Sequence, residues 1–385
     1  MSTPLLVVAG EISGDMHAAG LLRALRPLWP GLDVFGIGGE ALREQGADLL
    51  YDVNDMAVFG LPEALRRLPF FRRAFRDLLR EVDKRKPSVA LLVDYGGFNL
   101  RLARELKRRG IRVIYFISPQ VWASRPGRIP VMAEVIDRLL VIFPFEPEVF
   151  AGTRLKVNYV GHPLVDEAEA VLAAPAADLS WQGAPRIALL PGSRRQEIDR
   201  ILPVLWQAAA RIEGLHPAVS FRIAAPNAET ARHIEAKLAQ GTLGPTNWAV
   251  QTAQTRQILR QADAAFVASG TATVEAALLR CPMVVTYRTS PFMYLLGKRL
   301  VRVPYIGMVN LIAGRELCPE RIQDQATPQS LAAAMLPLLG DTEERRRTID
   351  GLASIAEKLG PPGAYARAAE RVAHDIETAV RPAGS

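Results

Sequence analysis

Short apolar runs alternate with longer amphipathic segments along almost the whole chain. The runs are rich in Val, Ile, Leu and Ala and have the length of strands, whereas the segments between them carry apolar residues at helical spacing. This alternation predicts βαβ units and therefore parallel sheets with helices packed on them. No apolar run approaches the length that a membrane-spanning helix requires.

The predicted strands fall into two sets, separated by a loose stretch rich in Ala, Pro and Asp. The first set covers 5–9, 33–37, 89–94, 112–117, 138–143 and 157–160, and the second covers 187–190, 219–224, 248–251, 264–268 and 282–287. A chain of 385 residues exceeds the size of one typical core. We therefore predict an α/β protein with two Rossmann-like domains whose parallel sheets face a cleft, and a linker near 165–185.

Composition narrows the class of partner. The formal net charge is +7 and the pI is about 9.6, which suggests nucleic acid, a phosphorylated metabolite or an acidic membrane surface. Two cysteines, Cys281 and Cys318, exclude a disulfide framework and fit a reducing compartment. The first ten residues lack a basic leader, so no signal peptide is expected. The scattered histidines have no metal-ligand spacing, so no metal site is expected.

The segment 267–278 has the pattern of an anion site. A strand leads into a turn of small residues and then into a helix, so Gly270 allows close approach of the backbone and the amides of the helix start favour phosphate. Thr271 and Thr273 add hydroxyls, and Glu275, about one turn into the helix, could hold two ribose hydroxyls. An ordinary capped helix start is the alternative interpretation.

A second segment, 187–198, repeats the arrangement of strand, glycine turn and helix. Arg194 and Arg195 lie in the first turn of its predicted helix. Cations at a helix start oppose the helix dipole, so an anion bound between them and the amides explains their position better than the helix alone.

Polar residues also follow four predicted strands of the first half, and ligands of such sheets bind beyond the carboxyl ends of the strands. Asp15, Asp94 and His162 are the titratable candidates there, although a helix cap, a turn and a packed histidine are the structural alternatives. The glycines of 36–39 form only a fragment of a dinucleotide fingerprint and follow the second strand, so no NAD site is predicted.

Seven segments, taken in order, resemble the lipid-A-disaccharide synthase family, GT-B glycosyltransferases of outer-membrane biogenesis. They are 9–15, 94–99, 118–123, 161–163, 190–194, 269–275 and 310–316. The resemblance implies a GT-B fold with a C-terminal helix that returns to the first domain. The expected domains are an acceptor and lipid domain at 1–170, a UDP-sugar domain at 171–355 and the returning helix at 356–385.

The resemblance also implies a reaction. A UDP-linked 2,3-diacylglucosamine would donate its sugar to the 6-hydroxyl of 2,3-diacylglucosamine 1-phosphate, which gives the β-1,6-linked disaccharide 1-phosphate and UDP. The family inverts the anomeric centre and uses neither metal nor cofactor. Such a displacement needs a base for the hydroxyl and positive charge for the departing diphosphate. A cytoplasmic enzyme at the surface of the inner membrane, monomer or homodimer, is expected.

Family position and chemistry together suggest a role for each residue. Asp94 is the first candidate for the base, with Asp15 and Glu11 as second choices. The resemblance suggests a second aspartate at the position of Gly97, or a proline at that of Gly96. This chain has a single carboxylate there, so a role that depends on two does not transfer. The expected substrate-binding residues are Ser13, His162, Ser193, Arg194, Ser269, Gly270, Thr271, Ala272, Thr273, Glu275, Asn310, Arg315 and Glu316.

Two segments are candidates for lipid contact. Apolar residues of 61–82 recur at helical spacing between many arginines, which is typical of a basic interfacial helix, and Pro69 is expected to break or kink it. The segment 291–302 mixes apolar bulk with three cations. Helices packed into the protein core are the alternatives for both. The expected membrane contacts are Leu68, Phe70, Phe71, Arg72, Arg73 and Phe75.

Two other functions compete with this interpretation. One is a different GT-B enzyme acting on a UDP-N-acetylhexosamine, such as a MurG-like transferase or an epimerase. The other is a basic membrane-binding or RNA-binding protein without catalysis. The second would explain the charge and leave the glycine turns without a purpose, and no nucleic-acid motif supports it. Nucleic acid is therefore not an expected partner.

Overall fold

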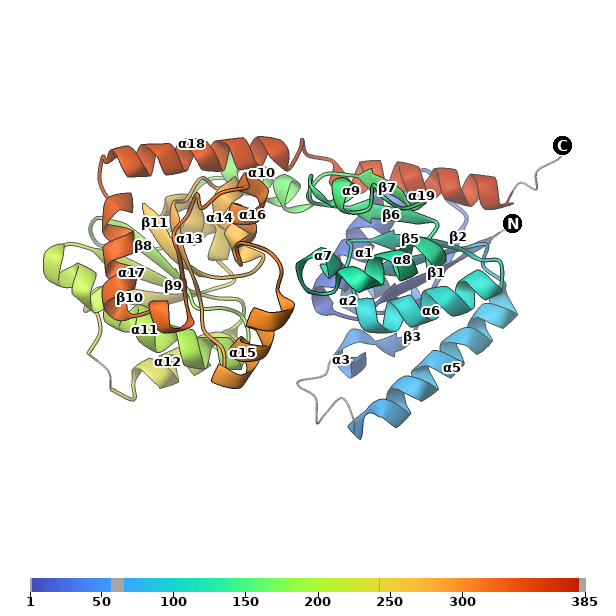
Figure 1. The fold of residues 1–385 in the computed structure, drawn as a ribbon, viewed down its shortest axis with the longest axis horizontal. Coiled ribbons are helices and arrows are strands. Elements are labelled where there is room, and N and C mark those ends of the chain that lie inside the picture. The colour runs from blue at the N-terminus through green and yellow to red at the C-terminus, as the bar shows by residue number, and fades with distance from the viewer. Residues whose placement is uncertain (1, 57–65, 242, 381–385) are drawn as a thin grey trace. The chain divides into compact units, whose positions relative to one another are not determined.

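The computed structural model describes residues 2–56, 66–241 and 243–380 (Figure 1). The chain forms two compact units, each built around one parallel sheet. Unit 1 comprises Met1–Pro163 and Pro361–Ser385, and unit 2 comprises Leu164–Gly360. The boundaries between the units thus lie after residues 163 and 360, whereas the sequence analysis expected domain boundaries after 170 and 355.

The sheet of unit 1 contains seven described strands in the order β3-β2-β1-β4-β5-β6-β7. Every adjacent pair is parallel, so all strands end at the same edge. The inner strands are apolar at nearly every position because helices cover both faces. The bounds are β1 Thr3–Ala9, β2 Leu32–Gly38, β3 Asp48–Asp52, β4 Val89–Val93, β5 Arg112–Phe116, β6 Arg138–Val141 and β7 Lys156–Tyr159.

The helices of unit 1 supply the apolar side chains that complete its core. Leu78 and Val82 of α5, for example, are buried against the sheet with Leu102 and Leu106 of α6. The bounds are α1 Ile12–Leu25, α2 Glu40–Glu44, α3 Val53–Met56, α5 Leu68–Arg85, α6 Gly96–Arg108, α7 Val121–Ser124, η1 Pro126–Arg128, α8 Ile129–Val135, α9 Glu146–Val149 and α19 Ala364–Val380.

The sheet of unit 2 contains six described strands in the order β10-β9-β8-β11-β12-β13, again all parallel. Its strands are β8 Arg186–Leu190, β9 Ser220–Ala225, β10 Trp248–Thr252, β11 Ala264–Ala268, β12 Met283–Tyr287 and β13 Glu320–Ile322. Its helices are α10 Leu164–Ala173, α11 Arg195–Leu215, α12 Ala228–Leu238, α13 Thr255–Gln261, α14 Ala272–Leu278, α15 Pro291–Leu300, α16 Met308–Ala313, η2 Gln323–Gln325, α17 Pro328–Met335, η3 Leu336–Leu338 and α18 Glu343–Lys358.

The stretch expected to be a linker belongs to unit 2. Its first part forms α10, which packs against α13 and α14. Farther on, the buried Arg222 donates through Nε to the carbonyl of Leu179 at 2.8 Å. The loose composition of 173–185 therefore marks a loop held on the unit 2 sheet, because a buried guanidinium needs those carbonyls as partners.

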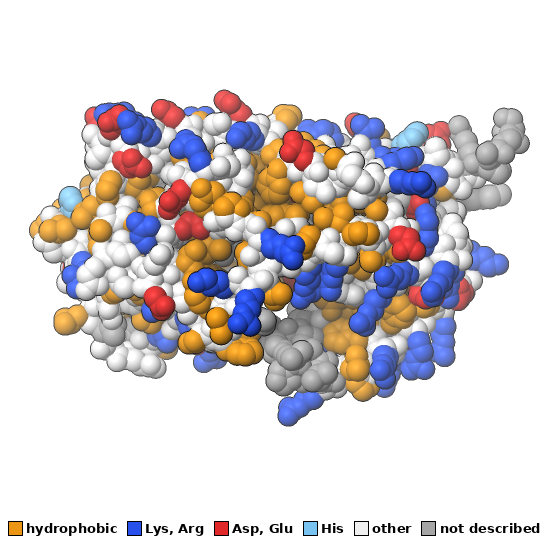
Figure 2. All heavy atoms as spheres, viewed as in Figure 1, with side chains coloured by type: hydrophobic (Ala, Val, Ile, Leu, Met, Phe, Trp, Pro, Cys, Tyr) orange, Lys and Arg blue, Asp and Glu red, His pale blue; other side chains and the backbone are white. Residues whose placement is uncertain are grey.

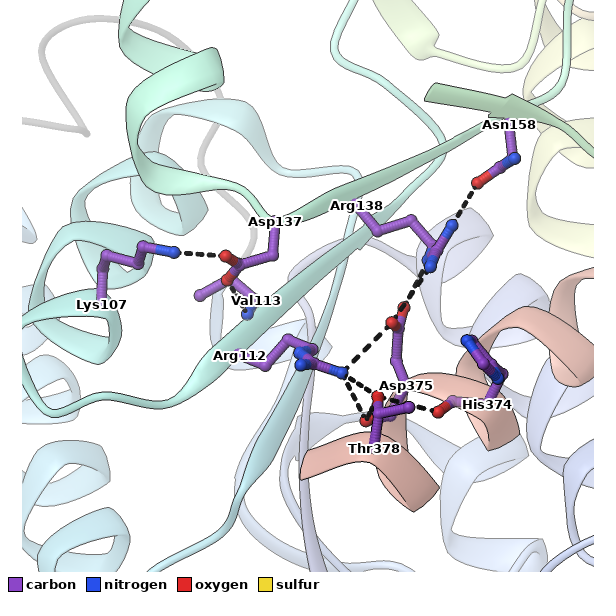
Figure 3. Close-up of polar contacts among 9 residues, drawn as sticks. All are labelled: Lys107, Arg112, Val113, Asp137, Arg138, Asn158, His374, Asp375 and Thr378. Carbon is purple, nitrogen blue, oxygen red and sulfur yellow. Dashed lines mark hydrogen bonds and ion pairs between the residues drawn. The ribbon is translucent and has the colours of Figure 1, made fainter. Parts of the chain in front are cut away.

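The C-terminal helix α19 belongs to unit 1, as the expected return to the first domain requires. It packs along α1, and the ring of Tyr365 lies where a side chain at Gly20 would be. Asp375 of α19 accepts hydrogen bonds from Arg138 of β6 and Arg112 of β5 (Figure 3). Because Asp375 is buried, these ion pairs fix α19 to the strands.

Among the described residues, no helix is long and apolar enough to cross a bilayer.

Candidate functional site

The sheet of unit 2 has its topological switch point between β8 and β11. From β8 the chain first builds outward to β9 and β10 and then returns to β11, which pairs with β8 on the other side (Figure 1). The paired positions Leu190 and Val267 lie at the ends of these strands, so the following loops leave the sheet side by side. Both predicted phosphate loops therefore lie where open α/β sheets bind ligands.

The loop after β11 presents its backbone. Gly270 has φ +153°, and a Cβ there would meet nothing within 4 Å, so the peptide surface is open. Ser269 Oγ donates to the carbonyl of Ile306 at 2.7 Å, and Thr273 Oγ donates to the carbonyl of Gly270 at 2.8 Å. These two hydroxyls thus hold the loop, and Thr271 is the hydroxyl that remains exposed next to Ala272.

The loop after β8 adds an exposed positive charge beside this backbone. Gly192 turns the chain with φ +111°, Ser193 is exposed and Arg194 is the N-cap of α11. The Arg194 side chain is 71% exposed and pairs with Glu197, with Nη1 3.0 Å from Oε1. Such an i,i+3 surface pair is weak, so the guanidinium can turn to an anion at little cost.

Glu275 lies at the start of α14 and has a partner that sequence patterns did not reveal. Arg256 of α13 contacts Glu275, with Nε 2.9 Å from Oε1, and also pairs with Glu167 of α10. Burial raises the pKa of Glu275, and the nearby Arg256 opposes this shift. Arg256 and Glu167 come from other helices, so no local spacing could have identified them.

The three residues expected to close the nucleotide side differ in exposure. Asn310 is fully buried: its amide nitrogen donates to the carbonyl of Cys318 and to Glu320, and its oxygen accepts from the amides of Leu317 and Cys318. Asn310 therefore shapes the loop before β13 and has no polar atom directed to solvent. By contrast, Arg315 and Glu316 are exposed, and Glu316 accepts from the amide of Glu320 at 3.2 Å.

The switch point of unit 1 lies between β1 and β4, and two acidic residues follow these strands. Ala9 pairs with Val93, so Glu11 and Asp94 leave the same edge of the sheet. Asp94 has φ +45°, and its Oδ1 accepts from the amide of Tyr95 at 2.8 Å. Asn99 donates to the carbonyl of Asp94 at 2.9 Å and so fixes this strained turn.

The environment of Asp94 is suited to proton transfer near neutral pH. Burial, and then the negative charge of Glu11, raise the pKa of Asp94 to about 6, although the Tyr95 amide opposes the shift. A general base works best when its pKa approaches the working pH. Asp94 therefore combines a raised pKa with a position at the carboxyl end of β4.

Asp15 is occupied by main-chain donors. Its Oδ1 accepts from the amides of Gly39 and Leu42 at 2.6 and 3.2 Å, and its Oδ2 accepts from Ala41 at 3.0 Å. The buried carboxylate therefore caps the start of α2. This agrees with the structural alternative of a helix cap, except that Asp15 itself belongs to α1. Ser13, on the preceding turn of α1, is exposed.

His162 is buried and kept neutral. Burial, and then the nearby His17, lower the pKa of His162 to about 3, and the ring lies 5.2 Å from the ring of Phe143. His17 itself contacts the Tyr365 hydroxyl through Nδ1 at 2.9 Å. A neutral imidazole at this place can donate one hydrogen bond and accept another, and it does not carry charge at physiological pH.

An apolar cavity of about 770 Å³ opens between α5 and the start of α6, and Tyr95, the residue after Asp94, lines it. Helix α5 begins at Leu68, so Pro69 lies in its first turn and no kink results; Leu61 and Leu65 of the predicted helix lie outside the described residues. One face of α5 is buried in the core, as the structural alternative held, and another lines this cavity. The cavity lining includes Leu68, Phe71, Arg72, Phe75, Tyr95 and Phe98.

The other two expected lipid contacts of α5 lie elsewhere. Phe70 packs edge to face against Tyr51 and Phe71, and the guanidinium of Arg67 lies 5.0 Å from its ring. Arg73 is exposed. The predicted group thus divides into residues that line the cavity and residues on its flank.

Helix α15 exposes its apolar side chains, which overturns the alternative of a core helix. Phe292, Met293 and Leu295 are 75%, 53% and 57% exposed, and Lys298 and Arg299 are exposed in the last turn. Figure 2 shows hydrophobic side chains gathered beside basic ones over this helix.

Comparison with known proteins decides the family. A family model described as lipid-A-disaccharide synthetase matches residues 5–371. The chain belongs to the lipid-A-disaccharide synthase family. It is 40% identical to the lipid-A-disaccharide synthase of Anaeromyxobacter dehalogenans, with 97% of each chain covered, and 39% identical to that of Geobacter sulfurreducens, with 95% of each covered.

Solved structures support the fold of this lipid-A-disaccharide synthase family member. The UDP-GlcNAc 2-epimerase of Neisseria meningitidis bound to UDP-GlcNAc matches with a TM-score of 0.57 at 12% identity, covering 97% of this chain and 100% of that one. The calicheamicin glycosyltransferase CalG4 matches with a TM-score of 0.62 at 15% identity, covering 99% and 100%. At this level of identity, the two structures establish the GT-B fold alone. The family match then distinguishes this chain from the epimerases that share the fold.

Proposed function

We propose that the protein transfers 2,3-diacylglucosamine from its UDP-linked donor to the 6-hydroxyl of 2,3-diacylglucosamine 1-phosphate. The products are the β-1,6-linked disaccharide 1-phosphate and UDP. The family match over residues 5–371 is the observation that carries this proposal, and the geometry of the two switch points supports it.

On unit 2, the donor diphosphate would bind at the loops after β8 and β11. The open peptide at Gly270 lets the diphosphate approach the backbone closely, and the exposed Arg194 offers charge. The amides of Thr273 and Val274 already donate to the carbonyls of Gly270 and Thr271, so the backbone before α14 would make the contact. This backbone and Arg194 both stabilise the negative charge that develops on the departing UDP, which is the task that positive groups perform in such displacements. Ser193 and Thr271 add exposed hydroxyls, and Glu275 would bind the ribose hydroxyls.

On unit 1, Asp94 would remove the proton from the acceptor hydroxyl. As the oxygen bonds to the anomeric carbon of the donor, the bond from that carbon to the UDP oxygen breaks and the proton moves to the Asp94 carboxylate. One displacement inverts the anomeric centre. Because its pKa is raised to about 6, Asp94 accepts the proton more readily than an aspartate with an ordinary pKa would.

The acyl chains would enter the apolar cavity beside α5, and the protein would bind the cytoplasmic surface of the inner membrane. The cavity has the volume and aromatic lining of a site for an apolar ligand. Exposed apolar residues of α15, followed by Lys298 and Arg299, fit an anionic bilayer surface.

A UDP-release assay with purified substrates tests the proposed reaction. UDP should form only when the UDP-diacylglucosamine donor and the acceptor 1-phosphate are both present, and EDTA should leave the rate unchanged. Release from the donor alone, or loss of activity with EDTA that a divalent metal restores, would contradict the proposed reaction or its mechanism.

A further inference from the structure

A small cavity of about 170 Å³ lies at the start of α6, adjacent to the apolar cavity. Its volume is roughly ten times what a single water needs in the same measure. Three of its lining side chains are arginines: Arg101 and Arg104, one turn apart on α6, and Arg128, just before α8. We refer to it as the basic cavity.

These three arginines have no acidic partner among the residues that the structure describes. Within the described parts of the chain, none of the three forms an ion pair or a side-chain hydrogen bond, whereas Arg108 and Arg109 on the same helix both pair with Glu105. Burial, and then the charges of Arg125 and Arg101, lower the pKa of Arg128. Like charges held together repel one another, and a bound anion relieves this repulsion.

The main chain at the start of α6 adds neutral donors. No described side chain caps the helix, and its first internal amide bond runs from the Asn99 N–H to the Tyr95 carbonyl at 3.2 Å. The amides of Gly96 and Gly97 therefore have no carbonyl partner within the helix. A Cβ at Gly97 would meet nothing within 4 Å, so a ligand can approach this backbone closely.

The basic cavity continues into the apolar cavity. Gly97 and Arg101 line both of them, and Phe71, Phe75 and Phe98 line the apolar one. Basic side chains gather over α5 and α6 in Figure 2. A ligand that occupied both would carry an anion and an apolar chain on one molecule.

The position of Asp94 relates this ligand to the reaction. Helix α6 begins two residues after Asp94, and Tyr95 between them lines the apolar cavity. A molecule held at both cavities would lie against the turn that follows Asp94, because Tyr95 lines one cavity and Gly96 lines the other. That arrangement matches an acceptor, which must present a hydroxyl to the base.

We propose that the basic cavity binds the phosphate monoester of the acylated acceptor through Arg101, Arg104, Arg128 and the first amides of α6. The acceptor's acyl chains then occupy the apolar cavity. This inference rests on the proposed function for the identity of the acceptor. In this assignment the three arginines recognise the acceptor's phosphate group. The phosphodiester of a bilayer lipid headgroup is the other anion that they could bind.

Steady-state kinetics with two acceptors tests the assignment. Arg101→Gln, Arg104→Gln and Arg128→Gln should each raise the KM for 2,3-diacylglucosamine 1-phosphate about tenfold or more, because each removes a charge-assisted hydrogen bond. The KM for the donor should stay within about twofold. With 2,3-diacylglucosamine, which lacks the phosphate, the wild type and the variants should have equally high KM values. Arg108→Gln, on the same helix and paired with Glu105, is the matched control and should change neither KM.

Several results would overturn the assignment. Equal losses with both acceptors would mean that the arginines do not recognise the phosphate, and unchanged KM values would remove them from the site. Phosphatidylglycerol in neutral detergent micelles should not compete with the acceptor; competition that Arg104→Gln abolishes would identify a bilayer headgroup site instead.

Equilibrium binding separates this inference from the proposed function. Calorimetric titration should show tighter binding of the acceptor with its phosphate than without it, and the difference should disappear in the three variants. If the wild type binds in this way and forms no disaccharide, the proposed function fails and the phosphate site stands. If it forms disaccharide with no preference for the phosphate, only this inference fails.

Discussion

Replacement of Asp94 by Asn tests the assignment of the base while leaving the fold in place. Asn keeps the shape of the side chain and, like Asp, tolerates the left-handed backbone at φ +45°. It cannot accept a proton at neutral pH. We therefore expect the Asp94→Asn protein to fold normally, to bind UDP as the wild type does, and to lose turnover by roughly 10²- to 10⁴-fold.

The pH dependence gives the magnitude that identifies the residue. With a pKa of about 6, the Asp94 carboxylate is about 90% ionised at pH 7 and about 10% ionised at pH 5, so kcat/KM should fall roughly tenfold. An aspartate at its ordinary pKa of 3.8 would remain almost fully ionised at pH 5. Glu146, whose pKa burial raises to about 7, is another carboxyl group that titrates in this range.

Glu11→Gln distinguishes these two carboxylates. Glu11 contributes to the raised pKa of Asp94 and not to that of Glu146, so the midpoint of the profile should move to lower pH in this variant. The assay is kcat/KM from UDP release between pH 5 and 8, with Asp83→Asn, an exposed carboxylate paired with Arg109, as the control. The assignment would be refuted if Asp94→Asn kept most of its turnover, or if the midpoint of the pH profile were the same in Glu11→Gln as in the wild type.

Three further predictions concern binding, stability and lipid contact. Arg194→Ala should weaken UDP binding roughly 10- to 100-fold in calorimetric titration, with an unchanged melting temperature since the side chain is 71% exposed; unchanged affinity would remove it from the nucleotide site. Asp375→Ala should lower the free energy of unfolding by about 3 kcal/mol in denaturant titration, because it leaves Arg138 without its buried partner, and a loss below about 1 kcal/mol would contradict that role. Phe292→Ser and Leu295→Ser should reduce sedimentation with anionic vesicles by roughly tenfold each at an unchanged melting temperature, and equal sedimentation would exclude α15 from membrane contact.

Hydrophobic patterning predicted the long, fully buried elements and missed the marginal ones. The inner strands of both sheets were predicted because runs such as Val89–Val93 are apolar at every position. The edge strands β3 and β13 were missed because Asp48–Asp52 and Glu320–Ile322 are short and carry charge, which is typical of exposed edges. They become strands through pairing with a neighbour, which no local pattern contains.

The same limit applies to the candidate site. The loops at Gly270 and Asp94 were predicted because strand, turn and helix follow one another along the chain. The buried contacts of Asp15 and Asn310 depend on amides of other segments, so a sequence motif could not separate their structural role from a catalytic one. Arg128 also joins Arg101 only through the packing of α8 on α6.

Product analysis with substrates of different acyl length tests the central claim most directly. A donor and an acceptor with distinguishable chains should yield one disaccharide whose mass is the sum of both sugars with a single phosphate, and its proton NMR spectrum should show a β anomeric linkage. The Asp94→Asn variant should form almost none of it. A free donor sugar, an epimerised UDP-sugar or an α linkage as the main product would contradict the account.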